Sequence, residues 1–210
     1  MIRILIADDH TIVREGLKQI LAETHDMLVA AEAENGQELL DKVFKNNYDV
    51  VLLDISMPGR SGLDILKQLK SEQPYLSVLI LSMYSEEQYA MRAIRAGASG
   101  YMTKESAPEE LIKAIRKVSQ GRKYISPSLA EKLAFSFESG NERPPHEILS
   151  DREYQVMCMI ASGKSVKEIA EGLSLSVKTI STYRSRILEK MNLKNNSALT
   201  HYAIQNRLVE

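Results

Sequence analysis

Several features that define other classes of protein are scarce in this sequence. Its one cysteine, Cys158, can form neither an internal disulfide nor a cysteine-based metal cluster. The apolar neighbours of Cys158 predict a small buried side chain there. No apolar run approaches the roughly 20 residues that a membrane-spanning helix requires. Acidic residues begin at position 8, so we do not expect a secretory signal peptide. These absences predict a cytoplasmic protein that does not enter a membrane.

The net charge of −1 conceals an asymmetry along the 210-residue chain. From Ile148 to the end, nine Lys and Arg residues stand against six Asp and Glu residues, a net charge of +3, whereas the preceding part carries −4. Between Lys178 and Arg207 there are six basic residues and a single acidic one. A chain of this length can form two small domains, and the asymmetry predicts that the two have different partners.

Five short apolar runs alternate with five amphipathic stretches over residues 1–120. Two of the runs, "VVLLD" and "SVLILS", are almost continuously apolar, as strands buried on both faces of a parallel sheet are. The alternation predicts an α/β fold, a doubly wound five-stranded parallel sheet of the flavodoxin-like kind with helices on both faces. The predicted strands are 2–7, 28–33, 50–54, 77–82 and 100–102, and the predicted helices are 11–24, 37–46, 61–71, 85–96 and 107–120.

After Gly121 this alternation ends. A short helix is predicted over residues 129–137, and the polar, proline-containing stretch "ESGNERPPHE" predicts a linker. The remainder predicts a small all-α domain with four helices, at 150–162, 166–172, 177–191 and 196–206. The expected organisation is a first domain at 1–120, a linker with a short helix at 121–147 and a second domain at 148–210.

Helix-capping residues support these helix positions. A serine followed three residues later by Glu or Gln is the pattern of a capping box, and a glycine just past a helix is the pattern of a C-cap. The expected capping boxes are Ser85 with Gln88, Ser106 with Glu109 and Ser150 with Glu153, and the expected C-cap glycines are Gly163 and Gly172.

The stretch "LIADDH" places two carboxylates together at the end of the first predicted strand. Asp54 ends the third strand, Ser82 ends the fourth, and Lys104 follows the fifth. In a doubly wound sheet the carboxyl ends of the strands meet at one edge, where ligands bind. Three clustered carboxylates favour a hard divalent cation, most naturally Mg²⁺. Beside the cation, one carboxylate can act as a nucleophile toward a phosphoryl group and form an acyl phosphate.

The first 120 residues resemble a response-regulator receiver domain, through the acidic pair, "LLDISMPGRSG", "ILS" and "GYMTK". The resemblance implies that Asp54 accepts phosphate from a sensor histidine kinase or from a small phosphodonor. It also implies a Mg²⁺ site formed by Asp8, Asp9, Asp54 and the backbone carbonyl of Ser56.

Three further residues receive roles from the same resemblance. Ser82 is expected to bond a phosphoryl oxygen, Lys104 to pair with the phosphate, and Tyr101 to be an aromatic switch. A phosphoryl group on Asp54 adds negative charge, which is expected to draw the Ser82 hydroxyl toward the phosphate. This movement would vacate space beneath the loop after the fourth strand, and Tyr101 is expected to rotate inward and fill it.

The segment 177–191 has the profile of a recognition helix. Its predicted outward face is short and mostly hydroxylic, and Lys178 and Arg186 flank it. The helix 166–172 and the turn 173–176 precede it with the compact spacing of a helix-turn-helix. Val177, by contrast, is expected to face the apolar interior.

Residues 148–210 resemble a LuxR-type helix-turn-helix domain. The resemblance implies base contacts by Ser181, Thr182 and Ser185. It implies phosphate contacts by Lys164, Lys167, Lys178, Thr179, Arg184, Arg186 and Lys190. Arg184 points toward the apolar face of the helix, so we expect its stem to be buried and its head to reach outward.

Both halves together resemble a NarL/FixJ-type response regulator. The resemblance implies a transcription factor rather than an enzyme, with double-stranded DNA, a sensor histidine kinase and RNA polymerase as partners. A homodimer on DNA is expected, because a single helix-turn-helix reads only a half-site. The last helix is too apolar to be fully solvated, so part of it is expected to pack on its domain and part to meet its twin. Its apolar residues are Leu199, Tyr202, Ala203 and Ile204.

Two other functions share part of this pattern. An aspartate-nucleophile phosphatase of the haloacid-dehalogenase type resembles it, but those enzymes carry D-x-D after the first strand, whereas the acids here are adjacent. A flavodoxin-like cofactor binder needs a glycine-rich phosphate loop after that strand, where this chain has "DDHTIVREG". The response-regulator interpretation is therefore favoured.

Overall fold

The structure is a computed structural model that describes residues 1–127, 129–131, 134 and 144–209. The chain forms two compact units, Met1–Lys132 and Leu133–Glu210. In the part of the chain that the structure describes, no helix is both long and apolar enough to cross a membrane. The predicted helix 129–137 and the linker stretch 138–147 lie largely outside the described residues. The structure groups residues 121–132 with the first unit, and the boundaries predicted from the sequence remain a prediction.

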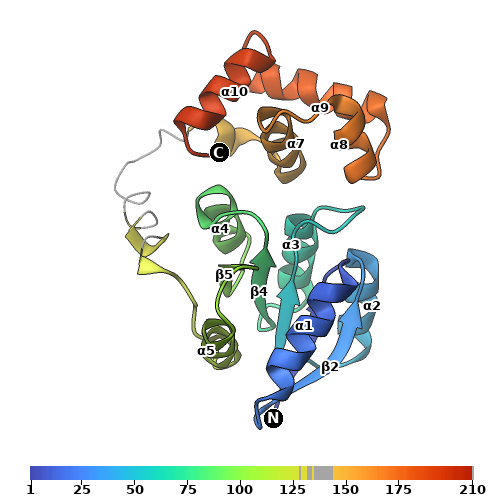
Figure 1. Cartoon of the computed structure of the whole chain (residues 1–210), viewed down its shortest axis with the longest axis vertical. Helices are drawn as coiled ribbons and strands as arrows, with labels where there is room; N and C mark the ends of the chain where they lie inside the picture. The colour runs from blue at the N-terminus through green and yellow to red at the C-terminus, as the bar shows by residue number, and fades with distance from the viewer. Residues whose placement is uncertain (128, 132–133, 135–143, 210) are drawn as a thin grey trace. The chain divides into compact units, whose positions relative to one another are not determined.

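The first unit has a five-stranded parallel sheet with the strand order β2-β1-β3-β4-β5 (Figure 1). Its strands are β1 (Ile2–Ala7), β2 (Met27–Ala33), β3 (Val50–Leu53), β4 (Ser77–Ser82) and β5 (Gly100–Thr103). Its helices are α1 (Thr11–Ala22), α2 (Gly36–Lys45), α3 (Gly62–Glu72), α4 (Glu86–Arg95) and α5 (Pro108–Ser119). The predicted α/β fold, a parallel sheet of five strands that alternate with five helices along the chain, is thus confirmed.

The pattern of apolar residues explains how the sheet is covered. Every residue of β3 and β4 is buried, because helices lie on both faces of these central strands. The helices α1 and α5 share one hydrophobic core with the sheet, which includes Leu17, Leu21, Leu111 and Ile115. The helices α2, α3 and α4 follow one another over the opposite face (Figure 1).

The outer edge of β5 carries a further extended segment. Tyr124 pairs with Gly100 in an isolated parallel bridge, and the Tyr124 amide donates to the carbonyl of Ser99 at 2.8 Å. A Cβ atom on Gly100 would lie only 2.7 Å from the Tyr124 carbonyl oxygen, so glycine permits this close approach. The segment after α5 therefore lies along the edge of the sheet at Tyr124.

Among the residues that the structure describes, the second unit has helices and no strand, as predicted, with the short 3-10 turn η1 (Pro145–Ile148) before helix α7. Its helices are α7 (Asp151–Ala161), α8 (Val166–Gly172), α9 (Val177–Lys190) and α10 (Asn196–Gln205). Most of α7 is buried, since it packs against α8, α9 and α10. Leu199 and Ala203 of α10 are fully buried, whereas Ile204 is 53 % exposed, so α10 packs on the domain with one part of its surface only.

The capping predictions are partly confirmed. Ser150 forms the expected capping box with Glu153. Ser85 is the N-cap of α4, but its side chain makes no capping hydrogen bond, so a capping box there is wrong. The box at Ser106 is also wrong, because α5 has Ala107 as its N-cap: the proline ring at the first helical position, residue 108, suits the start of a helix.

The two C-cap glycines have different outcomes. Gly163 follows the C-cap of α7 with a φ of 83°, as expected. Gly172 is instead the last residue of α8, and Leu173 is the C-cap. The left-handed conformation falls on Ser174, with a φ of 54°, so the turn before α9 does not use its glycine for this purpose.

Candidate functional site

Three carboxylates gather at the carboxyl edge of the sheet, and we call Asp8, Asp9 and Asp54 the acidic pocket. The register of β1 and β3 pairs Ala7 with Leu53, which places the residues that follow them side by side. Asp8 and Asp54 are each 2 % exposed, and Asp9 is half-buried. The convergence that the strand ends predict is present in the structure.

Lys104 connects two members of the pocket. Its Nζ atom lies 2.6 Å from Asp8 Oδ2 and 2.6 Å from Asp54 Oδ2. The other oxygen of Asp54 accepts a hydrogen bond from the Ser56 amide at 2.8 Å. Asp8, the first residue of the acidic pair, therefore forms an ion pair with Lys104. The sequence analysis expected Lys104 to pair with the phosphate and did not predict its contact with Asp8.

The remaining donor atoms fit a divalent cation. One oxygen of Asp9, Oδ1, is buried and accepts no hydrogen bond, although His10 Nδ1 lies 3.1 Å away. Asp8, Asp9, His10 and Asp54 offer ligand atoms that all lie within 4.8 Å of one another. A buried carboxylate oxygen without a hydrogen-bond donor is costly unless a cation approaches it. The pocket therefore has the oxygen ligands that suit Mg²⁺, and one of them, Asp9 Oδ1, accepts no hydrogen bond.

Burial and pairing set the charges in the pocket. Burial raises the pKa of the Asp54 carboxyl above its ordinary value, and the hydrogen bond from Lys104 opposes this rise without cancelling it. Burial alone lowers the pKa of the Lys104 ammonium, but hydrogen bonds to Asp54 and Asp8 outweigh burial and raise it. Lys104 consequently stays protonated at neutral pH and remains a cation beside the candidate nucleophile.

The two candidate switch residues hold the same backbone segment. Ser82 is fully buried, and its Oγ accepts a hydrogen bond from the Tyr84 amide at 3.2 Å. The Tyr101 hydroxyl donates to the Tyr84 carbonyl at 2.8 Å. Tyr101 is only 3 % exposed, so its side chain is buried in this structure, and its rotation on phosphorylation remains a prediction. Tyr84, which the sequence analysis did not select, therefore links the pair.

Two further residues that the sequence analysis missed shape the pocket. A Cβ atom on Gly62 would lie 2.4 Å from the Ile55 Cα, so only glycine lets the start of α3 approach the loop after Asp54. Arg14 of α1 is 5 % exposed and donates from Nη1 to the Asp8 carbonyl at 2.8 Å. Gly62 ends the stretch "LLDISMPGRSG", but its close approach to Ile55, like the contact of Arg14 with Asp8, depends on how the chain folds and could not be read from the sequence.

The candidate nucleic-acid interface is the exposed side of α9. Ser181, Thr182 and Ser185 are exposed, and each hydroxyl donates to the carbonyl four residues earlier. These hydroxyls keep their acceptor lone pairs for a ligand. Lys178 and Arg186 are exposed on the same helix. Of the remaining predicted phosphate contacts, Lys164 and Lys167 are exposed and Thr179 is half-buried.

Three residues of α9 behave differently from the simple helix pattern. Arg184 Nε donates to Asn196 Oδ1 at 2.7 Å, which ties α9 to α10. Lys190 Nζ lies 2.7 Å from Glu153 Oε2 of α7. Val177, expected to face the interior, is 51 % exposed because it stands in the first turn of the helix. The geometry gives Arg184 and Lys190 partners inside the domain.

Comparison with known proteins agrees with this geometry. The model of the response regulator receiver domain matches residues 4–116, and the model of the luxR family of bacterial regulatory proteins matches residues 147–203. The chain belongs to the NarL/FixJ-type response regulators. The regulator therefore consists of a receiver domain and a LuxR-type DNA-binding domain.

Curated relatives extend over the whole regulator. It is 38 % identical over 211 residues to the response regulator GacA of Pseudomonas aeruginosa, covering 100 % of this chain and 99 % of GacA. It is 38 % identical over 209 residues to the response regulator UvrY of Escherichia coli strain K12, covering 99 % of this chain and 96 % of UvrY.

Solved structures with both domains are also similar. One is RcsB from Salmonella enterica serovar Typhimurium bound to the promoter rprA in the presence of the phosphomimetic BeF3⁻, with 28 % identity and a TM-score of 0.64. It covers 96 % of this chain and 97 % of the RcsB chain. Another contains two RcsB dimers bound to two parallel DNAs, with 30 % identity, a TM-score of 0.59, and coverage of 97 % and 98 %.

Proposed function

We propose that phosphorylation of Asp54 by a sensor histidine kinase controls sequence-specific DNA binding by the second domain, and thereby transcription. The observation that carries this proposal is the pairing of Asp54 with Lys104 at 2.6 Å, inside a pocket where an Asp9 oxygen lacks a hydrogen bond. A buried carboxylate between an ammonium and a candidate cation site is a nucleophile whose product charge is neutralised in advance.

The reaction follows from the atoms at the site. A carboxylate oxygen of Asp54 attacks the phosphorus of the donor, an acyl phosphate bond forms, and the bond from phosphorus to the donor's nitrogen or oxygen breaks. The electron pair of that bond leaves with the donor. Mg²⁺, held by Asp8, Asp9, Asp54 and the Ser56 carbonyl, would neutralise charge on the phosphoryl oxygens. Lys104 remains close enough to pair with one of those oxygens, and Ser82 offers a hydroxyl nearby.

The second domain supplies the output. We assign base contacts to Ser181, Thr182 and Ser185, and the strongest phosphate contacts to Lys178 and Arg186, because these side chains are exposed on one helix. Weaker phosphate contacts are assigned to Lys164, Lys167, Thr179, Arg184 and Lys190. RcsB occurs as dimers on DNA in a similar structure, which supports a homodimer here. RNA polymerase is a further proposed partner, and we propose a regulator, not an enzyme, that acts in the cytoplasm.

The test uses acetyl phosphate as the donor. Wild type and Asp54→Asn are incubated with acetyl phosphate and Mg²⁺, and the intact mass is measured. We expect one phosphate adduct on wild type and none on the variant. Asp41→Asn, which changes an exposed aspartate of α2, is the matched control and should label like wild type. An equal adduct on Asp54→Asn would contradict the assignment, and so would a wild-type adduct that persists when EDTA removes Mg²⁺.

A further inference from the structure

The peptide that joins Asp8 to Asp9 is fixed from outside the acidic pocket. The Asp8 amide donates to the Ala33 carbonyl of β2 at 3.0 Å. The Asp8 carbonyl, which is part of the peptide between Asp8 and Asp9, accepts a hydrogen bond from Arg14 Nη1 at 2.8 Å. Because this peptide connects the two acidic residues, its plane determines how the Asp9 side chain leaves the backbone relative to that of Asp8.

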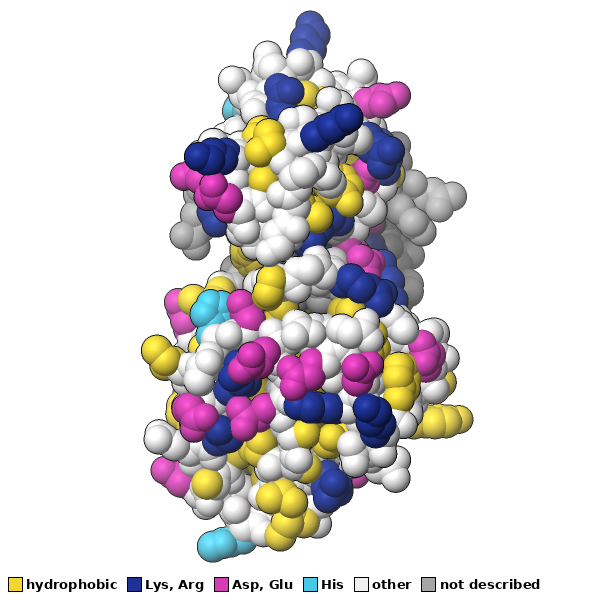
Figure 2. Space-filling model, turned by 90° about the vertical axis from the view of Figure 1, so that its right-hand side faces the viewer, with side chains coloured by type: hydrophobic (Ala, Val, Ile, Leu, Met, Phe, Trp, Pro, Cys, Tyr) yellow, Lys and Arg dark blue, Asp and Glu magenta, His cyan; other side chains and the backbone are white. Residues whose placement is uncertain are grey.

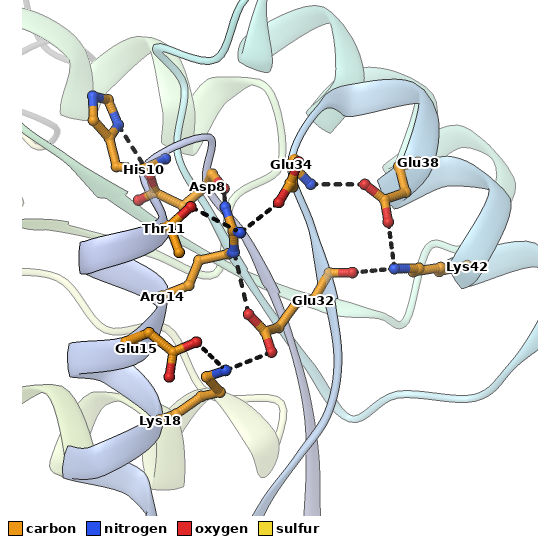
Figure 3. Close-up of polar contacts among 10 residues, drawn as sticks. All are labelled: Asp8, His10, Thr11, Arg14, Glu15, Lys18, Glu32, Glu34, Glu38 and Lys42. Carbon is orange, nitrogen blue, oxygen red and sulfur yellow. Dashed lines mark hydrogen bonds and ion pairs between the residues drawn. The ribbon is translucent and has the colours of Figure 1, made fainter.

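The Arg14 guanidinium is itself held in one orientation (Figure 3). Its Nε lies 3.2 Å from Glu32 Oε2, and its Nη2 lies 2.6 Å from Glu34 Oε1. The side chain of Arg14 is only 6 % exposed, so water has little access to its guanidinium, whereas Glu34 reaches it from the surface with 65 % of its own side chain exposed. A planar guanidinium with its nitrogens engaged in three directions is a rigid donor, unlike the single ammonium of a lysine.

The network continues along α1, through Lys18, and into α2, and it keeps Glu32 and Glu34 in place. Lys18 Nζ lies 2.9 Å from Glu32 Oε1, on the side away from Arg14. The Glu34 amide donates to Glu38 Oε2 at 2.9 Å, and Lys42 pairs with Glu38. On the face of the first unit that Figure 2 draws, Lys and Arg side chains lie among Asp and Glu side chains. The acids around Arg14 offset its charge, so it need not repel a cation in the pocket.

We propose that Arg14 is a positioning residue of the acidic pocket: its guanidinium fixes the peptide between Asp8 and Asp9 and so holds both carboxylates in the arrangement that binds the divalent cation. This inference rests on the proposed function, because it takes Mg²⁺ as the ligand of the pocket. Partners that orient metal ligands typically change metal affinity by about 10- to 100-fold when they are removed.

The test is calorimetric titration of the full chain with MgCl₂. We expect Arg14→Lys to bind Mg²⁺ at least about tenfold more weakly than wild type, since lysine keeps the charge but loses the fixed geometry. Arg14→Gln should also bind more weakly. If Arg14 acted only through its charge, removing that charge would tighten cation binding and the lysine variant would match wild type. Weaker binding by both variants is therefore the result that identifies positioning.

Two controls separate positioning from general damage. Arg116→Lys removes another bidentate arginine, which pairs with Asp26 at the far end of the sheet, and it should leave Mg²⁺ affinity unchanged. Circular dichroism and thermal unfolding without Mg²⁺ establish that each variant is folded. If Arg14→Lys does not fold, Glu34→Gln takes its place, with Glu15→Gln as its charge-matched control because Glu15 contacts Lys18 and not Arg14. Glu34→Gln should bind more weakly than Glu15→Gln.

The outcomes separate a failure of the Mg²⁺ site from a failure of the role of Arg14. Wild type that does not bind Mg²⁺ would remove the metal site of the proposed function. Wild type that binds, with a folded Arg14→Lys variant of equal affinity, would overturn the role of Arg14 alone. Equal affinities for Glu34→Gln and Glu15→Gln would overturn it in the same way.

Discussion

Lys104 Nζ lies 2.6 Å from Asp54 Oδ2, so the candidate phosphoacceptor already has a cation on one of its two oxygens. The same ammonium lies 2.6 Å from Asp8, which makes Lys104 a bridge between two buried carboxylates. In the proposed reaction, this bridge would leave a cation beside the phosphoryl group added at Asp54. When that group arrives, Lys104 can keep its charge partner while changing the oxygen that it contacts.

Removal of this bridge should reveal how much the fold depends on it. Lys104→Met leaves two nearly buried carboxylates facing each other, and breaking a buried ion pair by removing one partner costs about 3 kcal/mol. We expect the variant to unfold at a lower temperature without Mg²⁺ and to gain more from added MgCl₂ than wild type does, since a cation then fills the same role. Differential scanning fluorimetry measures both. Lys123→Met is the control, because the Lys123 ammonium donates to the Ala98 carbonyl and not to the acidic pocket. Equal Mg²⁺-induced shifts of the unfolding temperature in Lys104→Met and wild type would rule out this account.

The shared contact at Tyr84 predicts how the phosphate signal is relayed. Ser82→Ala removes the acceptor of the Tyr84 amide, and Tyr101→Phe removes the donor to the Tyr84 carbonyl. We expect both variants to take up phosphate at Asp54 almost normally and to lose most of the phosphate-dependent gain in DNA affinity. Intact mass and fluorescence anisotropy measure the two effects separately.

The matched control for Ser82 is on the same strand. Ser77→Ala also deletes a buried hydroxyl of β4, but that hydroxyl donates to the Val118 carbonyl at the opposite end. It should keep the gain in affinity even if it lowers stability. A Ser82→Ala variant that retains the full gain would show that the relay does not pass through this hydroxyl.

The sequence predicted the members of the acidic pocket because their positions follow from strand ends. Parallel strands bring their carboxyl ends to one edge, so Asp8, Asp9 and Asp54 could be grouped without coordinates. Arg14 and Tyr84 could not, since their roles come from backbone contacts that depend on how α1 and the loop after β4 fold back. An arginine on an amphipathic helix reads the same whether it is solvated or buried.

The second domain shows the same limit in another form. The helical periodicity of residues 177–191 located α9 correctly, yet it could not reveal that Lys190 pairs with Glu153, a residue 37 positions earlier in the chain. Nor could it place the left-handed residue at Ser174 rather than at Gly172, because the tertiary packing of α8 against α9 fixes that turn.

Two lysines of α9 should therefore respond differently to substitution. Lys178 is exposed at the start of α9, whereas Lys190 pairs with the buried Glu153. We expect Lys178→Gln to weaken DNA binding and to reduce the slope of log K against log salt by about 0.9, with little change in stability. Lys190→Gln should lower the free energy of unfolding by about 1 kcal/mol. Fluorescence anisotropy over a salt series and thermal unfolding test the pair; a reversed assignment of the two effects would contradict the geometry.

The Lys190 pair also predicts a pH dependence. Burial by itself raises the pKa of Glu153, but hydrogen bonds from Lys190 and Ser150 outweigh it, so the folded-state pKa lies below the ordinary value. A carboxyl whose pKa is lowered on folding contributes stability that is fully present above its unfolded pKa, about 4.3 for Glu. This stability is lost as the pH falls through the folded-state pKa. The stability difference between wild type and Lys190→Gln should therefore shrink as the pH is lowered from 7 to 3. A difference that stays constant over this range would exclude Glu153 as its source.

The exposed side of α10 should carry the contact between two copies on DNA. Leu199 and Ala203 are buried in the domain, which leaves Ile204, 53 % exposed, as the apolar residue on the outside of this helix. A charge at this position should oppose a two-fold contact, because each copy would bring the same charge to the interface. We expect phosphorylated wild type to bind a duplex with two half-sites as two copies, and Ile204→Glu to bind each half-site alone with no preference for the paired site.

Gln205→Glu, which adds the same charge about 100° around the helix, should behave like wild type. Sedimentation velocity with labelled duplex gives the number of copies directly. One copy of wild type per duplex at saturation would reject the dimer, whereas two copies of Ile204→Glu with undiminished preference for the paired site would place the contact elsewhere.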